Sequence, residues 1–283
     1  MTELAYDLHI HSCLSPCGDD DMTPANIAGM AALKGLDAVA LTDHNSCKNC
    51  PAFLAAAKEY GIIGIPGMEL TTSEEVHAVC LFPELYQAME FDRFVYSRLI
   101  KVKNRPEIFG KQQIYDENDS VYREESCLLI NAVNLSFEGL WEKAASYGGV
   151  MFPAHIDKNS NSLIANLGFI PPDSSFQTVE LKDMKKLHSL KREHPYLEHC
   201  RIISNSDAHY LEHINERGFT LPAAERSAKA VVDTLRRAHC KMRKLKYKSP
   251  CGTEAGRGMM GDRIKALKYS RKDAYDHDSR STD

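Results

Sequence analysis

Short apolar runs alternate with helix-type segments along the first two hundred residues, and this alternation limits the fold more than any other feature of the chain. The segment 23–34 illustrates a helix, because Thr23 is a good N-cap, Pro24 suits the first helical position and Gly35 ends it. Strands are predicted at 4–6, 38–41, 62–65, 76–82, 150–152, 177–181 and 201–204, and further helices at 51–60, 84–103 and 137–147. This order predicts an α/β fold with a parallel sheet covered by helices and closed as a barrel.

Polar residues stand at or near the ends of these predicted strands. The motifs are His-x-His at 9–11, Thr-Asp-His at 42–44, Gly-Met-Glu at 67–69, His77, Pro-Ala-His at 153–155 and Ser-Asp-Ala-His at 206–209. In a parallel barrel the carboxyl ends of the strands form one rim, where active sites are built. Core packing does not require this pattern, whereas imidazoles and carboxylates are the ligands of divalent metals. We therefore expect six of the twelve histidines to meet Asp43, Glu69 and Asp207 in one cavity.

Taken together, these motifs resemble the PHP (polymerase and histidinol phosphatase) family over about residues 4–240. The resemblance implies a distorted seven-stranded barrel of the PHP type, with the active site at the C-terminal rim of the strands, and a phosphoesterase activity. It also implies two or three divalent metal ions (Zn, Mn or Fe). By position, the first ion would be held by His9, His11, Glu69 and Asp207, the second by Glu69, His77 and His155, and the third by His44 and His209.

Cys17 departs from this pattern, because several trinuclear relatives carry a histidine at the corresponding position. A thiolate is a softer ligand, which favours zinc or ferrous iron over magnesium or manganese. The alternative is that Cys17 only lines the loop and the third site is weak or empty.

The expected chemistry is hydrolysis of a phosphoester. Two metals bridged by Glu69 would activate water as hydroxide and polarise the phosphoryl oxygens, with Glu69, Asp207 and His209 as the catalytic set. Asp43 is expected to orient a metal-bound histidine rather than bind metal itself. Candidates for contact with the substrate phosphate are Lys158, Asn159 and Arg217, each of which could equally be a solvated surface group.

The remaining cysteines leave several interpretations open. Cys47 and Cys50 form a Cys-x-x-Cys near the predicted rim, and with Cys13 and Cys17 they could form a metal or iron–sulfur site, a redox pair, or isolated thiols in a polar loop. Isolated thiols are favoured, since no specific signature fits. Three others, Cys80, Cys127 and Cys200, are predicted to be core residues. Nine scattered cysteines favour a reducing, cytoplasmic protein over a disulfide framework.

The domain prediction has two parts: a PHP metallo-phosphoesterase domain at 1–240 and a basic, weakly ordered tail at 241–283. Within the domain, 84–136 is too long for a plain βα connection and is interpreted as an insertion or cap. An amphipathic helix is predicted at 223–238, with an apolar stripe that includes Val231 and Leu235.

Composition narrows the functional classes. The chain is 43% hydrophobic and 26% charged with a net charge of −4, so nothing draws it globally to nucleic acid or anionic membrane. No apolar run approaches the ~20 residues of a membrane span, and the N-terminus does not resemble a secretory signal. The leading hypothesis is a phosphatase acting on a small phosphorylated substrate of nucleotide, sugar phosphate or histidinol phosphate type. The alternatives are a phosphodiesterase or exonuclease acting on nucleotides or oligonucleotide ends, for which nucleic acid is possible but not favoured, and a non-catalytic metal-binding regulatory module.

Overall fold

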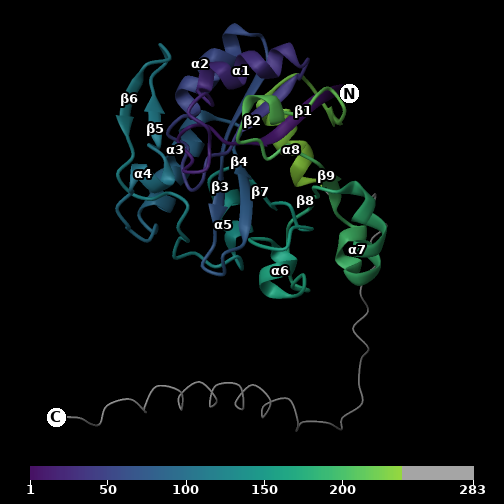
Figure 1. Ribbon diagram of the computed structural model, residues 1–283. Coiled ribbons are helices and arrows are strands. Elements are labelled where there is room, and N and C mark those ends of the chain that lie inside the picture. The colour runs from purple at the N-terminus through teal and green to yellow at the C-terminus, as the bar shows by residue number, and fades with distance from the viewer. Residues whose placement is uncertain (238–283) are drawn as a thin grey trace, which may run out of the picture. The chain divides into compact units, whose positions relative to one another are not determined.

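A computed structural model describes residues 1–237 of the chain (Figure 1). The strands are β1 (Thr2–Ile10), β2 (Ala38–Leu41), β3 (Ile63–Thr71), β4 (His77–Leu81), β5 (Gln113–Tyr115), β6 (Val121–Glu124), β7 (Val150–Pro153), β8 (Thr178–Glu180), β9 (Arg201–Ile203) and β10 (Thr220–Ala223). The α-helices are α1 (Pro24–Leu33), α2 (Cys50–Glu59), α3 (Leu85–Tyr96), α4 (Pro106–Phe109), α5 (Leu140–Ser146), α6 (Leu163–Leu167), α7 (Leu187–Glu193) and α8 (Ala228–Arg236). The prediction of a weakly ordered tail at 241–283 lies outside the described residues.

A six-stranded sheet in the order β10-β1-β2-β3-β4-β7 forms the centre of the fold. The first three strands pair in parallel, as predicted, but β4 pairs antiparallel with both β3 and β7. The prediction of a wholly parallel sheet is therefore wrong. Only five residues separate β3 from β4, too few for a crossover connection, so the chain must reverse direction there.

The parallel pair β8-β9 is joined by hydrogen bonds to this curled sheet near β7 and near the end of β1. The Ile156 N–H donates to the Glu180 carbonyl at 3.0 Å, which joins β8 to the segment after β7. The His11 N–H donates to the Ala208 carbonyl at 3.0 Å, which joins the segment after β9 to the end of β1. The result is a mixed α/β fold with a curled sheet, whose rim carries the segments that follow β1, β7, β8 and β9.

Two apolar clusters cover the two faces of the sheet. On β1, Leu4 and Leu8 belong to the cluster that includes Val231 and Leu235 of α8, so the predicted C-terminal helix packs on the sheet through its predicted apolar stripe. The other cluster contains Ile27 of α1 and Phe53 of α2, both fully buried. These helices pack against the sheet, and polar residues occupy its rim.

Local signals explain where the helices begin and end. The Thr23 hydroxyl accepts the Asn26 N–H at 3.2 Å, and Pro24 opens α1, as the sequence indicates. The helix predicted at 137–147 begins only at Leu140, because Gly139 has a φ of +79°. The helix predicted at 84–103 ends at Tyr96, after which the chain turns and Leu99 pairs with Val133.

The segment 84–136 contains α3, α4 and the antiparallel hairpin β5-β6. Figure 1 shows this hairpin on the side of the sheet away from β8, β9 and α7. The segment contacts two rim loops: the Gln113 N–H donates to the Cys13 carbonyl at 3.1 Å, and Asn45 Nδ2 donates to the Leu129 carbonyl at 2.7 Å. The predicted insertion thus borders the rim, while its action as a cap stays a prediction.

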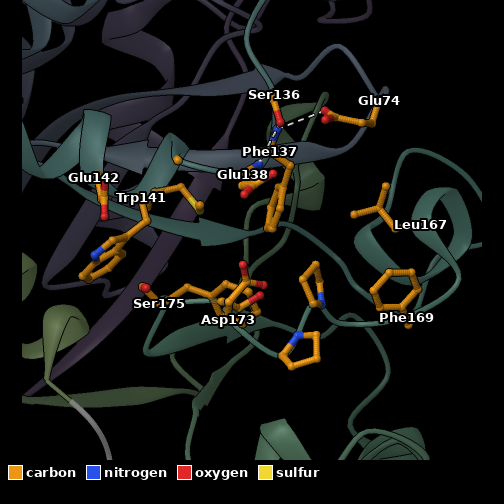
Figure 2. Close-up of a pocket in the computed structure, with 16 residues that line it drawn as sticks. Glu74, Ser136, Phe137, Glu138, Trp141, Glu142, Leu167, Phe169, Asp173 and Ser175 are labelled. Carbon is orange, nitrogen blue, oxygen red and sulfur yellow. Dashed lines mark hydrogen bonds between the residues drawn. The ribbon is translucent and has the colours of Figure 1, made fainter. Parts of the chain in front are cut away.

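A cavity of about 530 Å³ lies beside α5 and α6 (Figure 2). Aromatic side chains such as Phe137, Trp141 and Phe169 line it, together with two prolines and four carboxylates. None of the predicted metal ligands lines it, so it is separate from the rim cluster.

Within residues 1–237, no helix combines the length and the apolar character needed to span a membrane.

Candidate metal centre

The predicted metal ligands meet at one end of the sheet. Most of them follow the carboxyl end of a strand, but His77 is the first residue of β4. Because β4 runs antiparallel to its neighbours, its amino end lies at the same rim as their carboxyl ends. The ligands with almost no exposed surface are His9, His11, His44, Glu69 and His155. The cluster is therefore a buried polar centre and not a set of surface groups.

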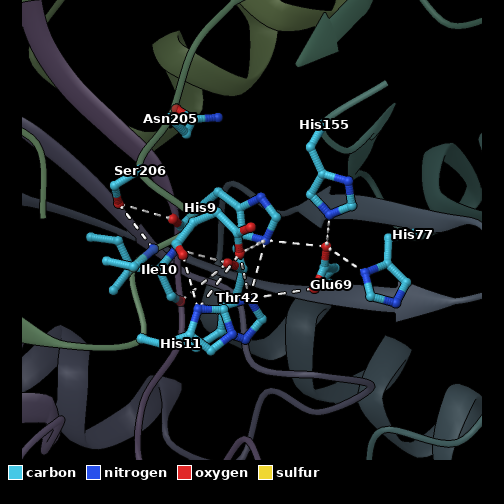
Figure 3. A network of polar contacts seen from close by, with 12 residues as sticks. His9, Ile10, His11, Thr42, Glu69, His77, His155, Asn205 and Ser206 are labelled. Carbon is cyan, nitrogen blue, oxygen red and sulfur yellow. Dashed lines mark hydrogen bonds and ion pairs between the residues drawn. The ribbon is translucent and has the colours of Figure 1, made fainter. Parts of the chain in front are cut away.

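Glu69 is the centre of this cluster, and Figure 3 shows the imidazoles directed at its carboxylate. The distances from a Glu69 oxygen to the nearest imidazole nitrogen are 3.0 Å for His77, 3.1 Å for His155, 3.2 Å for His44, 3.3 Å for His9 and 3.4 Å for His11. Asp207 adds a second carboxylate, with its Oδ1 3.5 Å from His9 Nε2 and 3.4 Å from His11 Nε2.

Three groups of side chains place ligand atoms within 4.8 Å of one another. They are His9, His11 and Glu69; His44, Glu69 and His77; and His11, Cys17, His44 and His209. These nitrogen, oxygen and sulfur donors are the types that bind zinc, iron and manganese. The geometry also fits a cation, since the Nε2 atoms of His9 and His11 face each other at 3.2 Å, and His44 Nδ1 is buried without a hydrogen bond.

Acceptors behind the histidines determine which imidazole nitrogen carries a proton. Glu180 Oε2 accepts from His9 Nδ1 at 2.9 Å, so Nδ1 keeps a proton and Nε2, which faces Glu69 and Asp207, is the atom that can bind a metal. His11 Nδ1 donates to the Ser15 hydroxyl at 2.9 Å, with the same consequence for His11 Nε2. Such outer contacts orient metal-binding histidines and increase their basicity.

Glu180 was not among the residues predicted from the sequence. It is fully buried at the end of β8, where it also accepts Asn205 Nδ2 at 2.8 Å and the His155 N–H at 3.2 Å. Its one signal in the sequence is an acidic residue between the apolar Val179 and Leu181 in the strand predicted at 177–181. An unpaired carboxylate is costly to bury, so this position required a buried donor nearby.

Asp43 makes no direct contact with an imidazole. It accepts the Ser12 N–H, the Ser12 hydroxyl and the Ser15 hydroxyl, each at 2.7 Å. The Ser15 hydroxyl in turn accepts from His11 Nδ1 and from the His44 N–H at 3.1 Å. Asp43 therefore helps to position two histidines through one hydroxyl group. This arrangement supports the proposal that Asp43 orients ligands.

The electrostatics of the centre favour a cation. Burial opposes the charged form of His9, but the carboxylates of Glu180, Glu69 and Asp207 outweigh it and raise the pKa of His9 well above its ordinary value. Burial would raise the pKa of Glu69, but the surrounding histidines hold it well below its usual range. At His209, burial and the neighbouring His11 lower the pKa to about 4. A divalent ion would compensate the same carboxylates, so metal binding would compete with protonation of His9 Nε2.

A family model described as PHP domain matches residues 7–242. The chain belongs to the PHP domain family.

Solved structures share the fold of this PHP domain. The lesion-specific endonuclease PfuEndoQ from Pyrococcus furiosus superposes with a TM-score of 0.57 at 21% identity, over 83% of this chain and 56% of that one. A putative metal-dependent phosphoesterase from Bifidobacterium adolescentis gives a TM-score of 0.50 at 18% identity, over 82% of this chain and 94% of that one. At these identities the likeness concerns the fold.

Two curated proteins match parts of the sequence. A 5′-3′ exoribonuclease from Haemophilus influenzae is 29% identical over 120 residues, which cover 39% of this chain and 43% of that protein. An uncharacterized protein from Methanocaldococcus jannaschii is 36% identical over 76 residues, which cover 24% of this chain and 44% of that protein. The matched regions thus span less than half the length of each relative.

The three predicted phosphate-binding residues lie in different places on the PHP domain. Lys158 Nζ is 2.5 Å from Asp207 Oδ2 and so borders the metal centre, and Asn159 is exposed next to it. Arg217 instead donates to the Gly35 carbonyl at 3.0 Å and pairs with Asp37 at 3.4 Å. These two residues precede β2, at the end of the sheet opposite the rim, so the structure does not bring Arg217 to the metal centre.

Of the cysteines outside the centre, Cys47 and Cys50 lie side by side. Cys47 and Cys50 are buried beneath the rim, with their sulfurs 3.1 Å and 3.5 Å from the Gly67 carbonyl oxygen, and Cys13 contacts the Gln113 carbonyl at 4.0 Å. Among residues 1–237, Cys17 is the one cysteine grouped with other potential ligands. A four-thiol site is thus not formed, and the buried thiols at 47 and 50 correct the expectation of a polar loop. Cys80 and Cys200 are buried as predicted, whereas Cys127 is only half-buried.

Proposed function

We propose that this PHP domain is a metal-dependent hydrolase that cleaves the ester of a small phosphorylated substrate, of nucleotide, sugar phosphate or histidinol phosphate type. The observation that carries the proposal is the buried convergence of imidazole nitrogens on Glu69, with the Nδ1 protons of His9 and His11 directed away from it. Family membership and the likeness to phosphoesterase and endonuclease folds support cleavage of a phosphoester bond.

The proposed metal sites follow the ligand groups. His9, His11, Glu69 and Asp207 would hold one ion, and Glu69 with His77 and His155 a second. Cys17, His44 and His209, together with His11, would hold a third, with zinc, iron or manganese as candidates. When bound, such ions lower the pKa of water and polarise phosphoryl oxygens. In this proposal the strands β1, β2, β3, β4, β7, β8 and β9 form the distorted seven-stranded barrel that surrounds the centre.

The protein's own residues then position the reactants. Glu180 and Ser15 keep protons on the Nδ1 atoms of His9 and His11, so that the Nε2 atoms remain donors of electron pairs. Lys158 places its ammonium at Asp207, where it can turn to a non-bridging oxygen of the substrate. With its lowered pKa, His209 is neutral at pH 7 and completes the proposed catalytic set of Glu69, Asp207 and His209.

The direct test is phosphate release by the metal-reconstituted chain, compared with His9→Ala and Glu69→Ala. Both variants should lose metal and activity while circular dichroism shows a folded protein. The matched control is Glu198→Ala, which removes an exposed carboxylate that is not among the proposed ligands. This variant should retain both bound metal and activity. Full activity in either centre variant would contradict the proposal.

A phosphodiesterase or exonuclease is the second candidate. It is favoured by the partial match to a 5′-3′ exoribonuclease and by the likeness to endonuclease Q, solved in a complex with a 27-mer duplex substrate that has an abasic lesion at the active site. That complex gives a TM-score of 0.51 at 24% identity, over 74% of this chain and 50% of that one. A panel of monoesters, diesters and 5′-labelled oligonucleotides separates the candidates, because a nuclease shortens the oligonucleotide from one end or within it.

A non-catalytic metal-binding module is the third possibility, and it predicts full metal occupancy without turnover of any ester in the panel. The cytoplasmic location expected from the cysteine pattern stays a prediction.

A further inference from the structure

The loop 45–49 follows the proposed ligand His44 and leads into α2. Apart from the half-buried Lys48 its residues are buried, although loops normally run over the surface, where water satisfies their polar groups. Each residue of this loop instead hydrogen-bonds to the segment 84–136. In Figure 1, α3 and the hairpin β5-β6 of that segment lie on the same side of the sheet. The insertion therefore supplies the partners that solvent would otherwise provide.

Asn49 shows most clearly that this loop is built to bind the insertion. It occupies the N-cap position of α2, where an asparagine side chain usually accepts an N–H of the helix, yet it makes no such bond. Its Oδ1 accepts the Tyr115 N–H at 2.9 Å, and its Nδ2 donates to the Gln113 carbonyl at 3.0 Å, so the amide pairs with the edge of β5. Nδ2 also donates to the Ser12 hydroxyl at 2.9 Å, and this hydroxyl donates to Asp43. Asn49 thus connects the hairpin to the hydrogen bonds that position the ligands.

Asp92 of α3 is a second support for the loop. The residue is 3% exposed, and its Oδ1 accepts the Ser46 hydroxyl at 3.0 Å and the Cys47 N–H at 2.8 Å. A carboxylate is costly to bury without donors. Asp92 is therefore stable in this position only while the loop provides them.

Asn45 holds the chain directly after His44. Its φ of 49° lies in the left-handed region, which asparagine tolerates better than most residues. Its Nδ2 donates to the carbonyls of Leu129 and Asn131 at 2.7 Å and 2.9 Å, and its Oδ1 accepts the Thr71 N–H at 3.0 Å. The direction of the chain after the ligand is thus fixed jointly by the insertion and by the end of β3.

His44 depends on its backbone more than the ligands of β1 do. The rings of His9 and His11 are oriented by hydrogen bonds from their Nδ1 atoms to Glu180 and Ser15. The described chain offers no such bond to His44, whose Nδ1 is buried without a hydrogen-bond partner and whose N–H donates to Ser15. The direction of its ring is therefore set by the position of its backbone, which the loop 45–49 holds.

We propose that the segment 84–136 positions His44 as a metal ligand through the loop 45–49, with Asn49 and Asp92 as the positioning residues. This inference rests on the proposed metal-dependent function and adds a support for the two ligand groups that include His44. It also gives a purpose to two features that the proposed chemistry leaves unused, the insertion itself and the loop that contains the Cys-x-x-Cys.

The experiment measures zinc binding at individual histidines of the full chain, by NMR of ¹⁵N-labelled imidazoles over a series of chelator-buffered free zinc concentrations. His44→Gln and His9→Gln assign the two ring resonances. The quantity compared is the ratio of the zinc concentrations at which His44 and His9 are half bound. Asn49→Asp places a carboxylate oxygen opposite the Gln113 carbonyl and should raise this ratio about tenfold. Asp92→Ala, which removes the other support without adding a charge, should raise it in the same direction.

Asn104→Asp is the matched control. Asn104 is 5% exposed, and its Nδ2 donates to the Gly110 carbonyl at 2.8 Å, a contact inside the insertion that does not involve the loop 45–49. The variant disturbs a buried amide of the same segment, so a loss of general stability would affect it as well. Its ratio should match the wild type. An unchanged ratio in the folded test variants, or an equal rise in Asn104→Asp, would overturn the proposal.

The same samples separate this inference from the proposed function. If zinc-loaded wild type hydrolyses no ester of the panel but the ratio rises in the test variants, the function fails and the positioning of His44 stands. If phosphate is released but the ratio is unchanged in the test variants, the function stands and the positioning fails. Zinc binding at none of the imidazoles would overturn both.

Discussion

Replacing Glu180 with glutamine tests whether a residue that touches no proposed metal controls the metal centre. The carboxylate is fully buried and accepts from three donors: His9 Nδ1, Asn205 Nδ2 and the His155 N–H. Glutamine has the same shape but only one oxygen. If that oxygen replaces Oε2, it keeps the bonds to His9 and Asn205, and the new NH₂ group faces the His155 N–H.

Two magnitudes follow from this geometry. One buried donor loses its acceptor, which costs about 1–3 kcal/mol of folding free energy. For a domain of this size each kcal/mol lowers the Tm by roughly 2–4 °C. In addition, the charge that increases the basicity of His9 is lost, and changes to such outer contacts typically reduce metal affinity or activity by about 10–100-fold. The loss of metal affinity corresponds to about 1.4–2.7 kcal/mol, which is comparable to the folding cost. Because a native domain is stable by about 5–15 kcal/mol, the protein should stay folded but be weakly loaded.

The assay is a competition titration with a chromophoric chelator, run beside phosphate release and a thermal melt. Glu198→Gln is the control, since Glu198 is 58% exposed and, within residues 1–237, forms an ion pair only with Lys191. We expect the control to match the wild type within about 0.5 kcal/mol. Unchanged metal affinity and unchanged kcat in a folded Glu180→Gln protein would refute the idea that Glu180 prepares His9 as a ligand.

Three further predictions concern other parts of the molecule. Cobalt-substituted protein should show a thiolate-to-cobalt absorption band that Cys17→Ser removes and Cys200→Ser retains; a band that persists without Cys17 would exclude it as a ligand. Lys158→Ala should lower kcat/KM by about tenfold or more, whereas Arg217→Ala, at the opposite end of the sheet, should leave it unchanged in the same assay. The pKa of Asp37 is below its ordinary value of 3.8, because burial, which would raise it, is outweighed by the Ala5 N–H and the neighbouring arginines. The ionised Asp37 carboxylate therefore stabilises the folded protein above pH 3.8, and this stabilisation is lost as the pH falls below that value. The free energies of unfolding of Asp37→Asn and the wild type, measured by urea titration, should accordingly converge in strong acid.

Most of the centre could be predicted from sequence because its ligands belong to short motifs at strand ends. A histidine pair such as His9 and His11 is a local pattern, and alternation of strands and helices brings the following motifs to the same rim. The sequence signal for the start of α1 is also local, because Thr23 caps the helix within its own first turn. Predictions of this kind depend on a few neighbouring residues and need no knowledge of distant contacts.

What only the tertiary structure decided depends on residues far apart in the chain. The sequence contains Arg217 within ten residues of His209, yet its partner Asp37 lies 180 residues away and draws it to the other end of the sheet. Glu180 becomes part of the centre only through contact with His9, which is 171 residues distant. Cys47 and Cys50 are buried where the loop after β2 packs against β3, and both sulfurs contact the Gly67 carbonyl. The sequence by itself determined which donors the protein would gather, because ligand type and strand-end position are local properties. Their protonation and their orientation were decided by long-range hydrogen bonds, such as that between His9 and Glu180, which form only once the sheet has curled.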